Sequence, residues 1–386
     1  MARRGSANPN IVLKGLLPQR IMTNIELAIF IKRLEAICHE MGLILRRAAF
    51  STNIKDRLDF SCALFDGTGA LFAQAAHIPV HLGSMAFAMR DIVNTISWRE
   101  GDLLILNDPF LGGTHLPDIT FISPIFSNRE ILGFVANRAH HASIGSITPG
   151  SMPISSTLEE EGYIITPTFL VRAGKLDLAL LERLTEVGGI TARGDISAQQ
   201  SANNVGLKRL IAIVKKMGSA RFLQGIEKVN AYGARIALSA LSSIPQGCYS
   251  FTDIMDDDGK GNFDLSIKCH IDVSSSRLAI DFKGTAQQVA GNVNCPLSVT
   301  AASAYYVFRC LLPVYTPSCD GVFQYLNITA PEGSLVNASR PSAVAAGNVE
   351  TSMRIVDVIL GALHQALPAK IPAASQGTMN NISMGN

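Results

Sequence analysis

The sequence predicts a mixed α/β (α+β) protein with multi-layer mixed β-sheets, a helical insertion and two to three subdomains. Its 386 residues are enough for two or three domains of roughly 150 residues each. Strand-like alternation is frequent before residue 175 and returns after residue 246, whereas helical periodicity fills the part between. We therefore expect an N-terminal α/β domain (1–175), a helical segment (176–245) and a second α/β segment (246–386), incomplete at its C-terminus.

The individual elements follow from local patterns. Thr23 or Asn24 can cap a long helix that begins at Ile25. A β-hairpin that turns at Asp66-Gly67 comes next. Helices are then expected over 81–96, 176–187, 195–217 with Asp195 as N-cap, 220–241, 296–312 and 350–367, and β structure over 102–108, 118–126, 131–139 and 247–286.

The composition excludes several classes of function. Charged residues make up only 17% of the chain, against about 25% in typical domains, so we expect large buried interfaces between domains or subunits. The net charge of +2 comes without a Lys/Arg stripe, which argues against nucleic-acid binding. The sequence contains no run of 18 apolar residues, so we expect no membrane span, and the expected location is the cytoplasm. Seven cysteines without a C-x-x-C indicate reduced, mostly buried thiols.

Two neighbouring stretches gather metal-compatible side chains, "NDPFLGGTHLPDIT" (107–120) and "NRAHHASIG" (137–145). Two imidazoles and one carboxylate suit Zn²⁺, Mn²⁺ or Fe²⁺ and leave a position open for water or substrate. His115 and Asp118 are separated by a turn-sized spacing, and one of His140 and His141 can supply the third ligand. Because adjacent strand residues point to opposite faces, the other histidine can contact substrate instead. The alternative is that these histidines are hydrogen-bonded structural groups.

Four further residues are candidate catalytic groups, and each has a structural alternative. Asp59 can point toward a metal-bound substrate or simply pair with Arg57. His81 can orient a carboxylate or substrate, or be buried with a backbone hydrogen bond. Asp108 precedes a proline and can be a turn former, and Glu161 can face the site or start a solvated helix.

Other motifs are weaker. The stretch "DDDGKG" (256–261) lacks the alternating acids of an EF-hand loop, so we interpret it as a hairpin turn. Neither the phosphate-binding G-x-x-x-x-G-K-[ST] nor a G-x-S-x-G nucleophile elbow is present.

Taken together, several stretches resemble the hydantoinase B/oxoprolinase family over nearly the whole chain. They are "DRLDFSCALFD", "IPVHLGSM", "GDLLILNDPFLGGTHLPDITFISPIF", "AHHASIGSITPGSMP", "EEGYIITP", "ARGDISAQQSANN", "GTAQQVAGNVNCP" and "ASQGTMNN". The resemblance implies an enzyme subunit in a hetero-oligomer with a hydantoinase A-type partner. That partner handles ATP and Mg²⁺ and activates a carbonyl oxygen by phosphorylation. In the carboxylase branch of the family, a His-x-x-Asp plus a later His holds a divalent metal. This pattern falls on His115, Asp118 and His140, which the resemblance therefore implies as ligands of a divalent metal (Mn, Zn or Fe).

The resemblance leads us to expect the B-type subunit of an ATP-dependent hydrolase of small cyclic amides, 5-oxoproline or a hydantoin. The alternatives are a subunit of an ATP-dependent ketone carboxylase and a truncated chain that binds a partner without catalysis. Two departures bear on this choice. Ser143 and Ser146 stand where relatives commonly have Asp and Gly, and relatives run beyond residue 386.

Overall fold

The computed structural model describes residues 22–76, 78–148 and 150–379. A seven-stranded sheet has the order β2-β1-β5-β4-β3-β6-β7, and a four-stranded sheet has the order β11-β10-β9-β8. The strands are β1 (Phe60–Asp66), β2 (Leu71–Ala76), β3 (Leu103–Leu106), β4 (Asp118–Ser127), β5 (Glu130–His140), β6 (Thr168–Arg172), β7 (Lys175–Leu176), β8 (Gly247–Asp257), β9 (Phe263–Ser274), β10 (Arg277–Asp281) and β11 (Leu326–Thr329). Neighbours in the large sheet are all antiparallel, and β10 and β11 are parallel.

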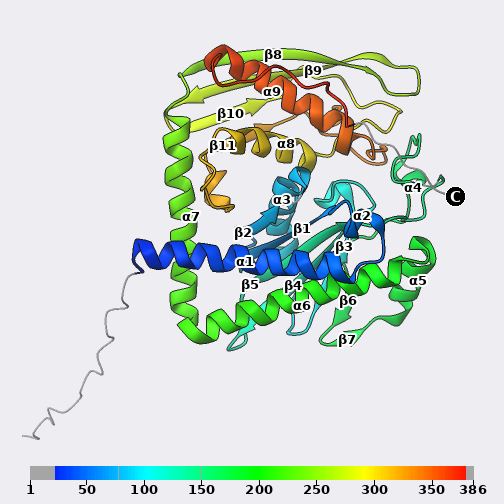
Figure 1. Ribbon diagram of the computed structural model, residues 1–386. Helices are drawn as coiled ribbons and strands as arrows, with labels where there is room; N and C mark the ends of the chain where they lie inside the picture. The colour runs from blue at the N-terminus through cyan, green and yellow to red at the C-terminus, as the bar shows by residue number, and fades with distance from the viewer. Residues whose placement is uncertain (1–21, 77, 149, 380–386) are drawn as a thin grey trace, which may run out of the picture.

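The helices cover both faces of the large sheet and continue into the second one (Figure 1). They are α1 (Asn24–Ala48), α2 (Thr52–Lys55), α3 (Pro79–Thr95), α4 (Leu158–Glu161), α5 (Leu178–Gly188), α6 (Ala192–Met217), α7 (Ser219–Leu241), α8 (Leu297–Cys310) and α9 (Ser352–Ala366). Three shorter turns are η1 (Pro109–Leu111), η2 (Asp320–Val322) and the π-helical η3 (Gly347–Thr351). The mixed α/β class expected from the sequence is therefore confirmed.

Successive side chains of β1 pack in two different hydrophobic clusters, which shows which helices cover each face of the large sheet. Leu64 packs in the cluster that contains α1 and α6 residues, whereas Ala63 and Phe65 pack in the cluster that contains α3 residues. Because alternate strand residues point to opposite faces, α1 and α6 cover one face of the large sheet and α3 covers the other. Figure 1 shows α8 beyond α3, then α9 against the small sheet.

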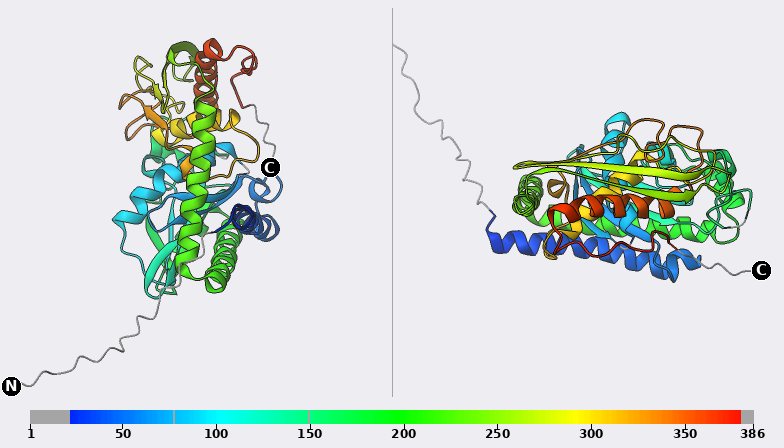
Figure 2. Two further views of the ribbon diagram at one scale, coloured as in Figure 1. Left: turned by 90° about the vertical axis from the view of Figure 1, so that its left-hand side faces the viewer. Right: turned by 90° about the horizontal axis from the view of Figure 1, so that it is seen from above.

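The contact between α3 and α8 is close because it includes a glycine. A Cβ atom at Gly83 would lie 2.7 Å from Cα of Ala302, a distance that real Cβ atoms do not show. At the edge of the molecule, α7 forms a column that spans both sheets (Figure 2, left). Together these contacts join the second sheet to the first, and a single hydrophobic cluster runs from Met22 to Ile371.

Most local predictions agree with the structure. Thr23 caps α1 in a capping box with Glu26, whose side chain accepts the Thr23 N–H at 2.8 Å. The predicted hairpin is β1–β2, and the Asp256–Gly261 stretch lies at the β8–β9 turn, where Asp258 accepts hydrogen bonds from Lys260 and Asn262. The prediction for Asp195 was wrong. This residue lies inside the first turn of α6, where its carboxylate accepts the N–H groups of Phe50 and Ser51.

Two further expectations concern the chain as a whole. All seven cysteines lie among the described residues and are unpaired, and five of them are buried. None of the helices in the described ranges has the length and hydropathy needed to cross a bilayer.

Candidate metal and catalytic site

Three strand ends of the large sheet meet at one edge and bring distant residues together. Strand β5 is antiparallel to both β4 and β1, so its last residue lies beside the first residues of both neighbours. His140 is directly opposite Asp118 in the ladder. The His140 N–H donates to the backbone carbonyl of Asp59 at 3.0 Å. The register of the sheet, rather than a local motif, therefore juxtaposes Asp59, Asp118 and His140.

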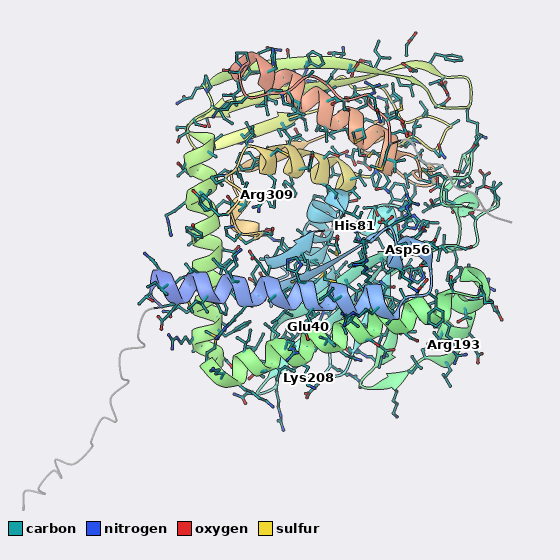
Figure 3. All side chains as sticks on the ribbon, viewed as in Figure 1. Glu40, Asp56, His81, Arg193, Lys208 and Arg309 are labelled. Atoms are coloured by element: carbon teal, nitrogen blue, oxygen red, sulfur yellow. The ribbon has the colours of Figure 1, made fainter. Side chains whose placement is uncertain are left out.

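Two more imidazoles complete the group around the Asp118 carboxylate. Nδ1 of His115, in the loop before β4, lies 3.1 Å from Asp118 Oδ2. His81, in the first turn of α3, places Nε2 3.2 Å from the same oxygen and Nδ1 3.2 Å from Ser61 Oγ. Figure 3 labels His81 near the middle of the molecule. The hydroxyl of Thr114 also donates to Asp118 Oδ2.

The other oxygen of Asp118 is left open. Asp118 is only 1% exposed, yet Oδ1 accepts no hydrogen bond from any residue in the described ranges. A buried carboxylate oxygen without a partner is costly. It is the kind of atom that a cation would satisfy.

The donor set fits a divalent cation. His115, Asp118 and His140 each offer a ligand atom, and these atoms lie within 4.8 Å of one another; Asp59, His81 and Asp118 form a second such group. Nitrogen and carboxylate oxygen ligands of this kind suit Zn²⁺, Mn²⁺ and Fe²⁺. The two groups share Asp118, which makes this carboxylate the centre of the cluster.

These residues line a cavity of about 230 Å³, which we call the histidine cavity. The remaining wall comes from the start of α3, the 151–152 segment and η3. The lining residues are Arg57, Asp59, Ile78, Pro79, Val80, His81, His115, Asp118, His140, Ser151, Met152, Asn348, Val349 and Met379.

Burial and charge shift the pKa values of the central residues in different directions. Burial alone would raise the pKa of Asp118, but the positive charges and hydrogen bonds of His115 and His81 hold it well below its usual range. Burial alone would lower the pKa of His115, but the charge of Asp118 raises it. The pKa of His140 is lowered by burial and by the charge of His115. His140 is therefore the more readily available neutral nitrogen ligand.

Asn53 can orient His140 toward an ion. Its side-chain amide lies 2.9 Å from His140 Nδ1. Oxygen and nitrogen of an amide are assigned from the hydrogen-bond network. With Asn53 Oδ1 accepting an Nδ1–H, His140 would present an unprotonated Nε2. No pattern in the sequence indicates Asn53, since a lone asparagine in a short helix belongs to no motif.

A buried arginine supports the loop that carries His115. Arg138 is 1% exposed, and it donates to Thr120 Oγ1 at 2.8 Å, Ser84 Oγ at 2.6 Å and the carbonyl of Gly112 at 2.9 Å. Burial lowers its pKa to about 10, which leaves it charged at neutral pH. Arg138, in β5, thus connects β4, α3 and the Gly112 loop through hydrogen bonds.

The glycine pair before His115 serves packing. Gly112 has φ +96°, and a Cβ there would overlap the side chain of Ala88 in α3; a Cβ at Gly113 would lie 2.5 Å from the carbonyl of Asn107. From the sequence, a Gly-Gly pair beside candidate ligands is expected to let backbone approach a ligand closely. The structure shows instead that it lets the loop approach α3 and fold on itself.

Three candidate catalytic residues are placed elsewhere. His141 points to the other face of the sheet, where its Nε2 lies 2.8 Å from Gln199 Oε1 in α6. Asp108 caps η1 through the Phe110 N–H at 3.1 Å and pairs with Arg340. Glu161 accepts the N–H groups of Val344 at 2.8 Å and Ala345 at 2.9 Å. None of the three is among the residues that line the histidine cavity, so we leave them out of the candidate site.

Asp108 and Glu161 nevertheless act on the site indirectly. Both bind the 340–345 segment, which leads into η3 and hence to the cavity wall at Asn348. Burial raises the pKa of Glu161 to about 7, against its hydrogen bonds to Ala345, Ser155 and Val344, which lower it.

Two serines stand where relatives commonly have Asp and Gly. Ser143 Oγ accepts the Gly145 N–H at 3.3 Å, and Ser146 Oγ donates to the carbonyl of Thr148. These contacts stabilise the turn after β5.

Comparison with known proteins gives one family and several relatives. The Hydantoinase B/oxoprolinase family model matches residues 23–386. The uncharacterized protein MJ0963 of Methanocaldococcus jannaschii is 41% identical over 359 residues, which are 90% of this chain and 63% of that protein. The 5-oxoprolinase of Dictyostelium discoideum is 35% identical, over 99% of this chain and 30% of its own length. The chain therefore spans less than two thirds of these relatives.

One solved structure is similar in both fold and sequence. The ATP-dependent caprolactamase from Pseudomonas jessenii superposes with a TM-score of 0.85 at 27% identity, covering 90% of this chain and 61% of that one.

Proposed function

The chain belongs to the hydantoinase B/oxoprolinase family, and from this premise we propose that it is the B-type subunit of an ATP-dependent cyclic-amide hydrolase. Its substrate class would be a small ring amide such as 5-oxoproline or a hydantoin. The observation that carries this proposal is the convergence of Asp59, His115, Asp118 and His140 on one cavity, with Asp118 Oδ1 free to bind a ligand. The names of the relatives, 5-oxoprolinase and caprolactamase, support the choice of ring amides.

Ring opening sets clear chemical requirements. Water adds across the ring C–N bond, so that the carbonyl carbon gains a hydroxyl group and the nitrogen gains a proton. The reaction needs a nucleophilic water near neutral pH and stabilisation of the oxygen that becomes negative. A divalent ion (Mn, Zn or Fe) held by His115, Asp118 and His140 would supply both, by lowering the pKa of a bound water and by acting as a Lewis acid.

The protein's own residues prepare the cavity for this chemistry. His81 and Thr114 fix one oxygen of Asp118, and the other oxygen has no hydrogen-bond partner among the described residues. Asn53 fixes the ring of His140. Asp59 lies in the same cavity, where its carboxylate can accept a proton from a water as a general base. Burial of the cluster strengthens each of these electrostatic interactions.

ATP would be handled by a separate subunit. This sequence has no G-x-x-x-x-G-K-[ST] phosphate loop, and the chain corresponds to only 30% of a 5-oxoprolinase. We propose a hydantoinase A-type partner that binds ATP and Mg²⁺ and phosphorylates the carbonyl oxygen. Phosphorylation makes the carbonyl carbon more electrophilic, so that water would add there and the C–N bond would break as a proton passes to the nitrogen. The acyl phosphate that remains would then be hydrolysed to a carboxylate and free phosphate.

Reconstitution tests the proposal. The chain is mixed with an A-type subunit, ATP, Mg²⁺ and 5-oxoproline, and the release of glutamate and ADP is followed, with a hydantoin as second substrate. We expect ring opening that requires both subunits and is lost in His115→Ala and Asp118→Ala. Ring opening that is indifferent to both substitutions would rule the mechanism out. ATP consumption that requires bicarbonate and a ketone would point to a carboxylase instead.

A further inference from the structure

A second cavity adjoins the histidine cavity, and its chemistry is different. It has a volume of about 390 Å³ and lies among the start of α3, α8, α9 and the segment after α9. We call it the apolar chamber because most of its wall is hydrocarbon, including Ile78, Val80, Ala302, Val307, Val356 and Leu360. Five residues line both cavities, namely Ile78, Pro79, Val80, Asn348 and Met379. The two cavities therefore share a wall.

Asn348 is the one polar side chain in that shared wall. It is 8% exposed, and its Nδ2 lies 3.4 Å from His115 Nδ1. Its Oδ1 accepts no hydrogen bond from the part of the chain that the structure describes. A buried amide oxygen of this kind costs free energy unless a partner donates to it. The free acceptor thus belongs to a residue that contacts a candidate metal ligand and lies in the wall shared by the two cavities.

The backbone around Asn348 is held rigidly. Asn348 belongs to η3, a π-helical turn, and such turns are often found at functional sites. A Cβ at Gly347 would lie 1.9 Å from the carbonyl of Asn294, so the turn packs directly on the 292–295 loop. Gly347 N–H donates to Asn292 at 3.1 Å, and the hydroxyl of Thr351 donates to Val293. Asn348 is therefore presented by a preorganised support.

We propose that Asn348 is the residue that recognises the ring amide, with Oδ1 accepting the ring N–H while the hydrocarbon part of the ring occupies the apolar chamber. This inference rests on the proposed function and narrows it to ring amides that carry an N–H and whose ring methylenes fit the apolar chamber.

Equilibrium binding to the metal-loaded chain alone tests this recognition. The probes are a six-membered lactam, its N-methyl derivative and the cyclic ketone of the same ring size, each titrated by calorimetry. Because one neutral hydrogen bond contributes up to about tenfold in affinity, we expect the lactam to bind about tenfold more tightly than both analogues. Asn348→Leu, of similar volume but without an acceptor, should bind all three probes equally. The control Asn327→Leu, at an exposed position of β11, should keep the preference.

A second variant tests the chamber. Ala373 lines it from an exposed position, so Ala373→Trp narrows the space without changing the core. We expect it to weaken binding of all three probes at least about tenfold while metal binding is retained. The proposal is overturned if the wild-type chain binds none of the probes, if the ketone binds as tightly as the lactam, or if Asn348→Leu keeps the preference.

These results are separable from a failure of the proposed function. If the reconstituted mixture hydrolyses its substrate but the chain shows no binding preference for the lactam with an N–H, only the proposed role of Asn348 is ruled out. An N–H preference that depends on Asn348, in a chain that supports no hydrolysis with its partner, would leave a lactam-binding site and remove the proposed enzyme activity.

Discussion

His81 Nε2 and Asp118 Oδ2 lie 3.2 Å apart although 37 residues separate them in the sequence. His81 is in the first turn of α3 and Asp118 begins β4, so the contact joins the helical layer to the edge of the large sheet. Both residues are 1% exposed. The contact fixes one oxygen of Asp118, while its other oxygen has no hydrogen-bond partner among the described residues.

Replacing Asp118 should abolish tight metal binding. Asp118→Asn removes the negative charge of the carboxylate shared by both candidate groups and replaces one of its two oxygens by an amide nitrogen. We expect the dissociation constant for a divalent metal to rise by at least about 100-fold, since even residues that only orient ligands affect it by 10–100-fold. Metal titration followed by calorimetry measures this. Asp272→Asn, at an exposed position of β9, is the control, and equal losses in both variants would contradict a specific role of Asp118.

Removing Asn53 should weaken the metal site without unfolding the protein. Asn53→Ala frees the ring of His140, which Asn53 contacts at 2.9 Å. We expect metal affinity to fall by about 10–100-fold, and the free energy of unfolding to change by less than about 1 kcal/mol, because one partly exposed hydrogen bond is lost. Unchanged metal affinity would show that Asn53 does not orient His140.

The sequence predicted those parts of the site that depend on local patterns. His115 and Asp118 lie in one short stretch, and period-two alternation predicted that only one of His140 and His141 reaches the site. The choice of His140 came from the resemblance to the family. The long-range contacts of His141, Asp108 and Glu161 could not be predicted, because their partners Gln199, Arg340 and Val344 are 58, 232 and 183 residues away. The residue type alone does not distinguish a histidine or carboxylate that binds a ligand from one that stabilises a loop through hydrogen bonds.

The same limit applies to the fold. The long helices and strands have strong periodicity and were predicted, and the cap expected at Thr23 or Asn24 predicted the start of α1, which begins at Asn24. The strands β7 and β11 have two and four residues, too few for alternation to indicate them. Asn348 was missed because its significance comes from the packing of η3 on the 292–295 loop, which no local pattern shows.

Arg138 should be essential for stability. Arg138→Met removes a fully buried guanidinium and leaves Thr120, Ser84 and the Gly112 carbonyl without this partner. We expect the free energy of unfolding in urea to fall by about 3 kcal/mol or more, because each unsatisfied buried group costs about 1–3 kcal/mol. Arg90→Met removes a largely exposed ion pair with Asp320 and should cost at most about 1 kcal/mol. Similar losses in the two variants would contradict this account.

Glu161 should make stability depend on pH. Burial raises its pKa from 4.5 to about 7. Between these values the unfolded chain has released the proton while the folded protein still binds it, so the free energy of unfolding falls as pH rises and levels off above about pH 7. The contribution is about 3 kcal/mol at 1.36 kcal/mol per pKa step.

Two variants isolate that contribution. Glu161→Gln keeps an oxygen that can accept the N–H groups of Val344 and Ala345 but cannot titrate, so it should lose this part of the pH dependence in urea unfolding between pH 4.5 and 7.5. Glu159→Gln, at an exposed position of the same short helix, should behave like the wild type. A Glu161→Gln curve parallel to the wild-type curve would show that Glu161 titrates near its ordinary pKa.

The most direct measurement is pulsed electron paramagnetic resonance of the chain loaded with one equivalent of Mn²⁺. Nitrogen nuclei bound to the ion modulate the spin echo, so the number of imidazole ligands can be counted. We predict couplings from two imidazoles, reduced to one in His140→Ala and in His115→Ala. An echo without nitrogen coupling, or the same coupling in all three proteins, would show that the ion is not held where three strand ends of the large sheet meet.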